Sequence, residues 1–189
     1  MSVFLPDGYD RPRRFPTIAI FHGGSWNAGD PNWHYPDCEY WASRGMIAVS
    51  VDYRLRDQDG VGVPLECVKD AKSVVRHLRE NAAQLKVAPN KIVCAGGSVG
   101  AQLAATTAMI QATEVNDAKD NLDISCIPNA VIAYNPWYKC QPELLPVSNI
   151  VKNSPPIITF AGGKDKAIPL KEMLDFHNQF KQHGNTSKL

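Results

Sequence analysis

Short apolar runs, most of them separated by longer helical segments, constrain the fold of this chain more than any other feature. The run TIAIF, for example, is apolar or β-branched throughout and is followed closely by a pair of glycines. Runs of this kind are typical of strands in a parallel sheet that is covered on both faces. The runs that we expect to form strands are residues 2–5, 17–21, 46–52, 91–95, 130–134 and 156–161.

The segments between these runs carry helical patterns. Leu65, Val68, Ala71 and Val75 recur at helical spacing with charged residues between them. Strands that alternate with helices predict an α/β fold, namely a three-layer α/β/α sandwich around a doubly wound, mostly parallel sheet. The helices that we expect are residues 36–44, 65–83, 98–112 and 169–183.

Length and composition indicate one globular domain over residues 1–189. Hydrophobic residues make up 44 % and charged residues 21 % of the chain, which are ordinary values for a globular protein. Residues 113–129 and 137–155 are polar and Pro-rich, and we expect them to cross the surface as loops. The net charge of +1 shows no basic excess of the kind that binds nucleic acid. No apolar run reaches the roughly 18 residues that a transmembrane helix needs, so we expect no membrane partner.

The cysteines and the first residues bear on the compartment and on metal binding. There are five cysteines, an odd number, and no two have C-x-x-C spacing, so we expect free thiols, no metal site and no organic cofactor. The N-terminal residues lack the apolar stretch of a secretory signal, which favours the cytoplasm. An upstream segment outside this sequence would change that expectation to secretion.

The most specific motif is the G-x-S-x-G formed by GGSVG. It lies between an expected strand and an expected helix, the context in which a sharp turn presents a nucleophilic serine. Gly96 and Gly100 lack a Cβ atom, so strand and helix can approach each other closely. Ser98 is therefore the candidate nucleophile, and the N–H of Val99 at the helix N-terminus is the first candidate oxyanion donor. The alternatives are a turn that only caps the helix and a phosphate-binding loop, which the absence of a following G-K-[ST] disfavours.

A second glycine motif, HGGSW, follows the expected strand TIAIF. It resembles the H-G-G-G motif of esterases and lipases, in which backbone N–H groups supply the second oxyanion donor. Gly23 and Gly24 are the candidates for that role, while Ser25 stands where the third glycine would be. The histidine of this motif usually orients the loop, so we expect His22 to be structural and Trp26 to pack beside the pocket.

Four motifs in order, HGGSW, VDYRL, GGSVGA and GGKD, resemble the α/β-hydrolase fold esterases, close to the small carboxylesterase and acetyl-esterase group. The resemblance covers nearly the whole chain. It implies that Asp165 is the acid of a Ser–acid–His triad, which would orient the histidine. It also implies that Tyr53 and Arg54 lie behind the oxyanion loop, and we expect Asp70 to be an ion-pair partner. The alternative for Asp165 is a cap of the helix that begins near Pro169.

The resemblance places the triad histidine after one further strand, and the sequence ends as that strand would begin. We therefore expect a sheet that is incomplete at both ends, lacking the last strand and the histidine loop. His177 and His183 are expected on a helix surface and not as general bases. An open sheet edge would favour pairing with another chain and hence an oligomer.

The motifs together predict a serine carboxylesterase that hydrolyses short-chain acyl esters, such as carbohydrate acetyl esters, through an acyl-enzyme on Ser98. A small-molecule ester is the expected partner. One alternative is a serine peptidase of the prolyl-oligopeptidase type, although no extra domain is visible. The other is an inactive or incomplete hydrolase-fold protein that acts as a binding module.

Overall fold

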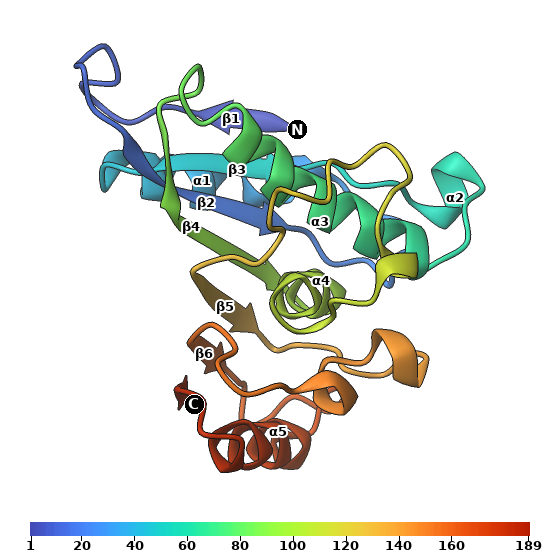
Figure 1. Ribbon diagram of the computed structural model, residues 1–189. Coiled ribbons are helices and arrows are strands. Elements are labelled where there is room, and N and C mark those ends of the chain that lie inside the picture. The colour runs from blue at the N-terminus through green and yellow to red at the C-terminus, as the bar shows by residue number, and fades with distance from the viewer.

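The computed structural model describes residues 1–189 and contains one seven-stranded sheet (Figure 1). The strand order is β1-β3-β2-β4-β5-β6-β7, and only the pairing of β1 with β3 is antiparallel. The predicted mostly parallel sheet is therefore confirmed. The strands are β1 Ser2–Phe4, β2 Phe15–Phe21, β3 Ile47–Val51, β4 Val87–Gly97, β5 Ala130–Tyr134, β6 Ile157–Phe160 and β7 Ser187–Lys188.

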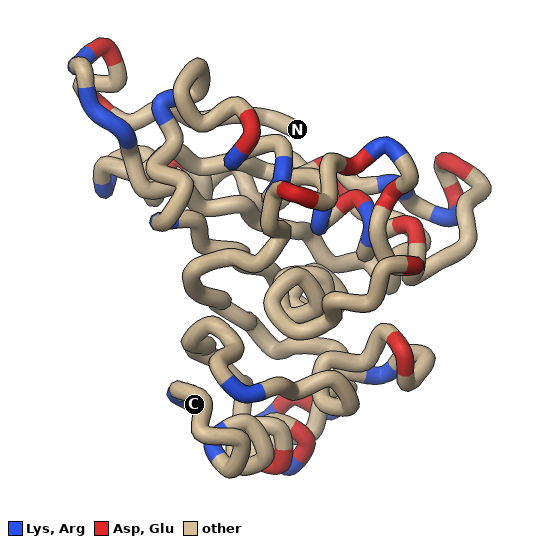
Figure 2. The backbone as a smooth tube through the Cα atoms, viewed as in Figure 1, with Lys and Arg blue, Asp and Glu red and all other residues tan.

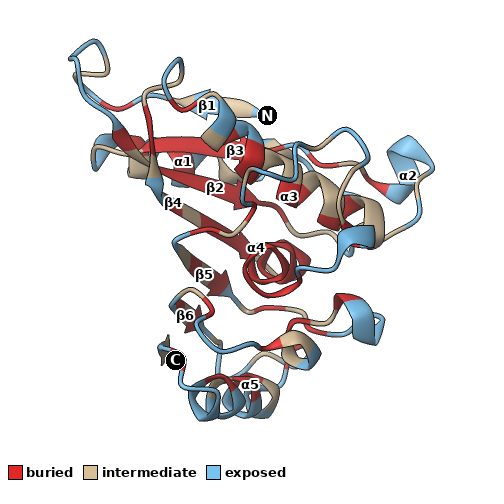
Figure 3. Ribbon diagram, viewed as in Figure 1, coloured by how far each residue is buried: buried red, intermediate tan, exposed pale blue.

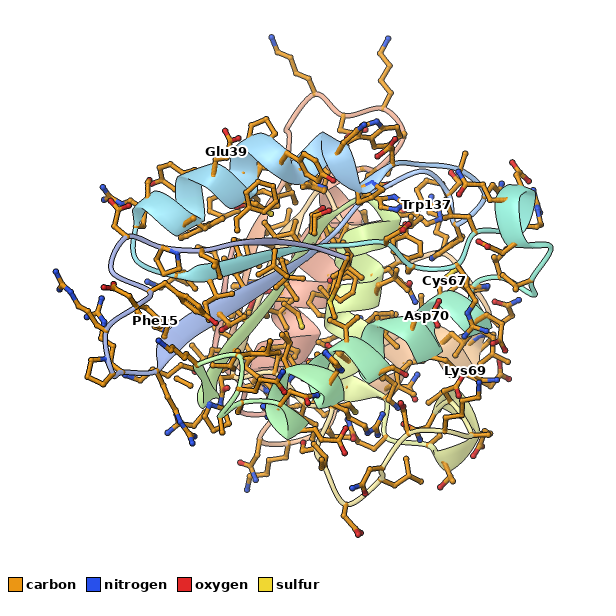
Figure 4. All side chains as sticks on the ribbon, turned by 90° about the horizontal axis from the view of Figure 1, so that it is seen from above. Phe15, Glu39, Cys67, Lys69, Asp70 and Trp137 are labelled. Carbon is orange, nitrogen blue, oxygen red and sulfur yellow. The ribbon has the colours of Figure 1, made fainter.

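Helices cover both faces of this sheet. Helix α1 lies on one face, and α3 and α4 lie on the other, as Figures 1 and 4 show from two directions. Each predicted helix is present with slightly different ends. The α-helices are α1 Tyr35–Ser43, α2 Arg56–Asp59, α3 Leu65–Glu80, α4 Val99–Met109 and α5 Leu170–Gln182. Short 3₁₀ helices are η1 Pro31–His34, η2 Thr113–Val115, η3 Pro142–Leu144 and η4 Pro146–Asn149.

The two faces of the sheet bury cores of very different size. In β2, Ala19 and Phe21 belong to a cluster of 35 buried residues on the side of α3 and α4, whereas Ile18 and Ile20 belong to a cluster of five on the side of α1. This alternation follows from the two-residue period of a strand. All residues of α4 are buried, and Figure 3 shows this helix red along its length. Charged residues are absent from α4, whereas α3 and α5 carry several (Figure 2).

The two segments that we expected to be surface loops contribute to the core. Val115 and Cys126 are buried in the first, and Tyr138, Leu144 and Ile150 are buried in the second. Their polar and Pro-rich composition correctly predicts irregular structure. It does not reveal the few apolar side chains that attach each segment to α3, α4 or α5.

Two global properties of the chain are visible in the fold. No helix combines the length and the hydropathy that are required to cross a lipid bilayer. All five cysteines are free, and Cys140 is the only one that is not fully buried.

Candidate active site

Ser98 occupies a sharp turn between the end of β4 and the start of α4. Its backbone has φ 55° and ψ −121°, a conformation that residues with a side chain rarely adopt. Its N–H donates to the carbonyl oxygen of Tyr134 at 3.0 Å, and its own carbonyl accepts from the N–H of Trp137 at 3.0 Å. The chain that follows β5 therefore holds the Ser98 backbone on both sides.

The glycines of the G-x-S-x-G motif permit this turn sterically. A Cβ atom at Gly100 would overlap the carbonyl oxygen of Phe21, at the end of β2. A Cβ atom at Gly96 would lie 2.6 Å from the same oxygen. Two strands and a helix thus meet at a point where no side chain fits, as the sequence predicts for these glycines.

The HGGSW loop lies directly beside Ser98. A Cβ atom at Gly23 would be 3.5 Å from the Cβ atom of Ser98, so the backbone of Gly23 faces the serine closely. Gly24 has φ +115°, and a side chain there would overlap the carbonyl of Ala28. Ser25 also has a positive φ and is exposed. It lines a neighbouring cavity with Trp26 and not the cavity that contains Ser98.

The His22 side chain stabilises the conformation of the HGGSW loop. The ring is fully buried, and Nδ1 donates to the carbonyl oxygen of Gly23 at 2.7 Å. The ring stacks on Tyr53 with centroids 4.3 Å apart, and the Tyr53 hydroxyl donates to the carbonyl of His22 at 2.7 Å. Burial lowers the pKa of His22, so the ring is neutral. These contacts agree with the structural role that we expected for His22 and with the placement of Tyr53 behind the loop.

The ion pair that we expected of Asp70 is present next to this element. Asp70 accepts from Nε of Arg54 at 2.9 Å and from the backbone N–H of Arg54 at 2.8 Å. Figure 4 shows Asp70 and Cys67 on α3, across the sheet from Glu39 on α1. Asp70 lies outside the group of residues that lines the cavity with Ser98.

Asp165 lies in the loop that follows β6. Its Oδ1 accepts from the backbone N–H groups of Ala167 at 2.8 Å and Ile168 at 3.0 Å. Its Oδ2 accepts from Nδ2 of Asn135 at 2.8 Å. Helix α5 has Pro169 at its N-cap and no side-chain cap, so Asp165 does not cap α5.

An open cavity of about 780 Å³ lies at the carboxyl ends of β2, β4, β5 and β6. Tyr134 and Phe160 stack on each other along one side, with ring centroids 5.2 Å apart. Trp33 and His34 from η1 lie in the wall as well. The lining residues are Gly23, Trp33, His34, Gly97, Ser98, Tyr134, Asn135, Thr159, Phe160, Ala161, Gly162 and Leu189.

Sequence reasoning missed several of these lining residues, above all His34 and Asn135. His34 is the only histidine in the lining, and its Nδ1 lies 2.7 Å from Oδ2 of Asp37. No histidine is hydrogen-bonded to Asp165, and His177 and His183 bond instead to Ser187 and to Gln179. The position of Asn135 directly after a predicted parallel strand was the available signal, because the carboxyl ends of such strands meet at one edge.

The site does not contain the donors that a metal ion requires. No three His, Cys, Asp or Glu side chains lie close enough together to hold one. The groups that this edge of the sheet presents are a serine hydroxyl, backbone N–H groups and a carboxylate.

Fold and site together define the chain as an α/β hydrolase. Comparison with known proteins gives its family: residues 1–136 match BD-FAE, and the chain belongs to that family. The apo form of Thermogutta terrifontis esterase 2 superimposes with a TM-score of 0.93 at 34 % identity, over 99 % of this chain and 75 % of that chain. The predicted resemblance to α/β-hydrolase fold esterases is thus confirmed.

Curated relatives match a shorter part of the chain. Carboxylesterase NlhH of Mycobacterium tuberculosis (strain ATCC 25618 / H37Rv) is 33 % identical over 96 residues, which are 50 % of this chain and 29 % of that protein. An AB hydrolase superfamily protein of Schizosaccharomyces pombe is 32 % identical over 104 residues, or 54 % of this chain and 30 % of the relative. The matched part thus spans less than a third of the length of these curated relatives.

Proposed function

We propose that this chain carries the nucleophile, the oxyanion donors and the acid of a serine carboxylesterase. The observation that carries the proposal is the strained turn at Ser98, which opens into a cavity beside the backbone of Gly23. A backbone conformation that disfavours side chains is retained where the surrounding structure enforces it, and such residues cluster at active sites. The esterase names of several relatives support the same reaction class.

In the proposed reaction, the Ser98 hydroxyl oxygen attacks the ester carbonyl and the carbonyl oxygen becomes an oxyanion. The N–H of Val99, the first residue of α4, has no partner within the helix and would donate to that oxyanion. Gly23 and Gly24 would supply the second donor. Collapse of the intermediate releases the alcohol, which takes the proton lost by Ser98, and water then hydrolyses the acyl-enzyme.

Asp165 would serve as the triad acid. A carboxylate in this position holds a histidine in the tautomer that accepts the serine proton and stabilises the protonated ring. Two backbone N–H groups and Asn135 hold the carboxylate of Asp165. Because none of the five histidines of this sequence contacts Asp165, we assign the general base to none of them.

We further propose that the substrates are small esters with short acyl groups, and that carbohydrate acetyl esters are among them. The cavity is open and has aromatic side chains in its wall, which suits a small acyl group and an alcohol that extends into solvent. Thermogutta esterase 2 has been solved with propionate and with butyrate bound, which supports short acyl groups. The resemblance to acetyl esterases supports the carbohydrate ester.

The test is hydrolysis of p-nitrophenyl acetate, butyrate and octanoate by the protein and by its Ser98→Ala variant. We expect kcat/KM to be highest for acetate or butyrate and hydrolysis to vanish in Ser98→Ala. Ser73→Ala is the matched control, because the Ser73 hydroxyl bonds to the carbonyl of Lys69 on α3 and does not line the cavity. Equal hydrolysis by Ser98→Ala and the unaltered protein would contradict the proposal, and a preference for octanoate would contradict the proposed substrate class.

A further inference from the structure

Asn135 has an unusual backbone conformation, and both the oxygen and the nitrogen of its side-chain amide are hydrogen-bonded. It follows β5 directly and has φ 40°, in the left-handed region that asparagine tolerates better than most residues. Its Oδ1 accepts from the backbone N–H of Gly162 at 2.7 Å, and its Nδ2 donates to Oδ2 of Asp165 at 2.8 Å. The N–H of Gly162 can only donate, so the orientation of the amide follows from its partners.

The residues on either side of Asn135 hold the Ser98 turn. The carbonyl of Tyr134 accepts from the N–H of Ser98, and the N–H of Trp137 donates to the carbonyl of Ser98, both at 3.0 Å. Residues 134–137 are therefore bonded to the Ser98 backbone through their own backbone. Through the side chain of Asn135 they are bonded to the loop that carries Asp165.

The middle of that loop is exposed, while Ala161 and Ile168 at its ends pack in or against the core. Gly162, Gly163, Lys164 and Lys166 are exposed, and a Cβ atom at Gly163 would meet nothing within 4 Å. Oδ1 of Asp165 accepts from two backbone N–H groups of the same loop, one from exposed Ala167 and one from Ile168, which is buried in the core. Asn135 is the side chain that hydrogen-bonds the carboxylate to another segment of the molecule, the end of β5.

We propose that Asn135 is a positioning residue that sets the place of Asp165 relative to Ser98. The proposal rests on the function proposed above, in which Ser98 is the nucleophile and Asp165 the acid. Asn135 does not touch the reacting atoms and acts through Asp165. Removal of the Asn135 side chain would leave the nucleophile and the oxyanion donors in place. It would let the loop that carries Asp165, here called the acid loop, move.

The first test measures, without an activity assay, how strongly the Asn135 side chain restrains the loop that carries Asp165. Amide hydrogen exchange, followed by NMR, is compared at Gly162, Ala167 and Ile168 in the unaltered protein, Asn135→Ala and Asn135→Asp. We expect at least about tenfold faster exchange at all three amides in Asn135→Ala, because the loop opens more often. Asn135→Asp keeps an acceptor for Gly162 but loses the donor to Asp165, so faster exchange is expected at Ala167 and Ile168 alone.

Asn149→Ala is the control for this measurement. The Asn149 amide also donates hydrogen bonds, in its case to the backbone carbonyls of Leu145 and Pro142, but it lies outside the cavity. It should leave the exchange of the acid loop unchanged. Unchanged exchange in Asn135→Ala would overturn the proposal.

The second test asks whether Asn135 acts through Asp165. For p-nitrophenyl acetate, and in a form of the protein in which a histidine is hydrogen-bonded to Asp165, we expect Asn135→Ala to lower kcat on the order of 100-fold. KM should change little, as for a catalytic group displaced by about 1 Å. Added to Asp165→Ala, the same substitution should have no further effect on kcat. An equal loss in both backgrounds would overturn the positioning role. If the unaltered protein hydrolyses no ester, the proposed function fails, while the exchange measurement still decides whether Asn135 clamps the loop.

Discussion

The Ser98 turn and the Asp165 loop lie at the same edge of the sheet but are held in place by different kinds of contact. Around Ser98 the backbones of β2, β4 and α4 meet so closely that glycine is required at Gly96 and Gly100. Around Asp165 the chain is mostly exposed, and hydrogen bonds of side chains fix its position.

This difference separates the consequences of substitution. In the turn, an added methyl group collides with backbone that cannot move without disturbing the core, so stability should fall. In the loop, the loss of a polar side chain leaves the core intact, so catalysis should fall while the fold remains.

The largest expected effect is that of Ser98→Gly. It removes the nucleophile, and loss of a triad nucleophile costs on the order of a million-fold in kcat. It also relieves a backbone conformation that disfavours side chains, so the free energy of unfolding should rise by about 1 kcal/mol. Ester hydrolysis and urea unfolding of the same sample check both statements. A less stable Ser98→Gly would show that the turn stores no strain.

The next effect is that of Asp165→Asn. In a form of the protein in which a histidine is hydrogen-bonded to Asp165, we expect kcat to fall about 10⁴-fold, as loss of the triad acid does elsewhere. The amide oxygen can still accept from Ala167 and Ile168, so the melting temperature should change little. Steady-state kinetics and calorimetry check the pair of outcomes. Full activity in this variant would remove Asp165 from the mechanism.

A matched pair of glycine substitutions tests the contrast through stability alone. Gly100→Ala places a methyl group on the carbonyl of Phe21 and should lower the free energy of unfolding by about 3 kcal/mol. Gly163→Ala meets open space in the acid loop and should change it by less than about 0.5 kcal/mol. Urea unfolding of both variants gives the comparison. Similar losses of unfolding free energy in the two variants would show that the Ser98 turn and the Asp165 loop tolerate an added methyl group equally.

The smallest effect concerns the pH dependence of stability at His22. Burial lowers its pKa below the ordinary 6.5, so below that pH the unfolded chain binds a proton that the folded chain does not. This contribution is fully present above about pH 6.5 and is lost as the pH falls toward the folded pKa. His22→Phe should therefore flatten the fall of unfolding free energy below about pH 6.5, by up to about 1.4 kcal/mol per pH unit. The exposed His183→Ala is the control, and identical slopes for His22→Phe and the unaltered protein would contradict the burial of a neutral ring.

The fold was predictable because its signals are local. Continuous apolar runs marked every long strand, and glycine or proline marked the ends of several helices. Interior contacts of residues such as Tyr138 and Leu144 were not predictable, because isolated apolar residues in a polar segment have no periodicity. Their burial depends on which helix the segment crosses.

The site was predictable only where a motif carries it. Ser98 and Gly23 belong to motifs with a fixed local geometry, and the structure brings these two residues together. Asn135 has no motif, and its bond to Asp165 joins residues 30 positions apart through the order of β5 and β6 in the sheet. His34 has no motif either. It lies on η1, which is bonded to β3 through the Ser50 hydroxyl and the carbonyl of Pro31.

Covalent labelling tests the nucleophile role of Ser98 most directly. The protein and its Ser98→Ala variant are treated with a fluorophosphonate, and the modified peptide is identified by mass spectrometry. We expect one adduct for each chain, on Ser98, and none on the variant. Labelling of another residue, or equal labelling of Ser98→Ala, would contradict the assignment of Ser98 as the nucleophile.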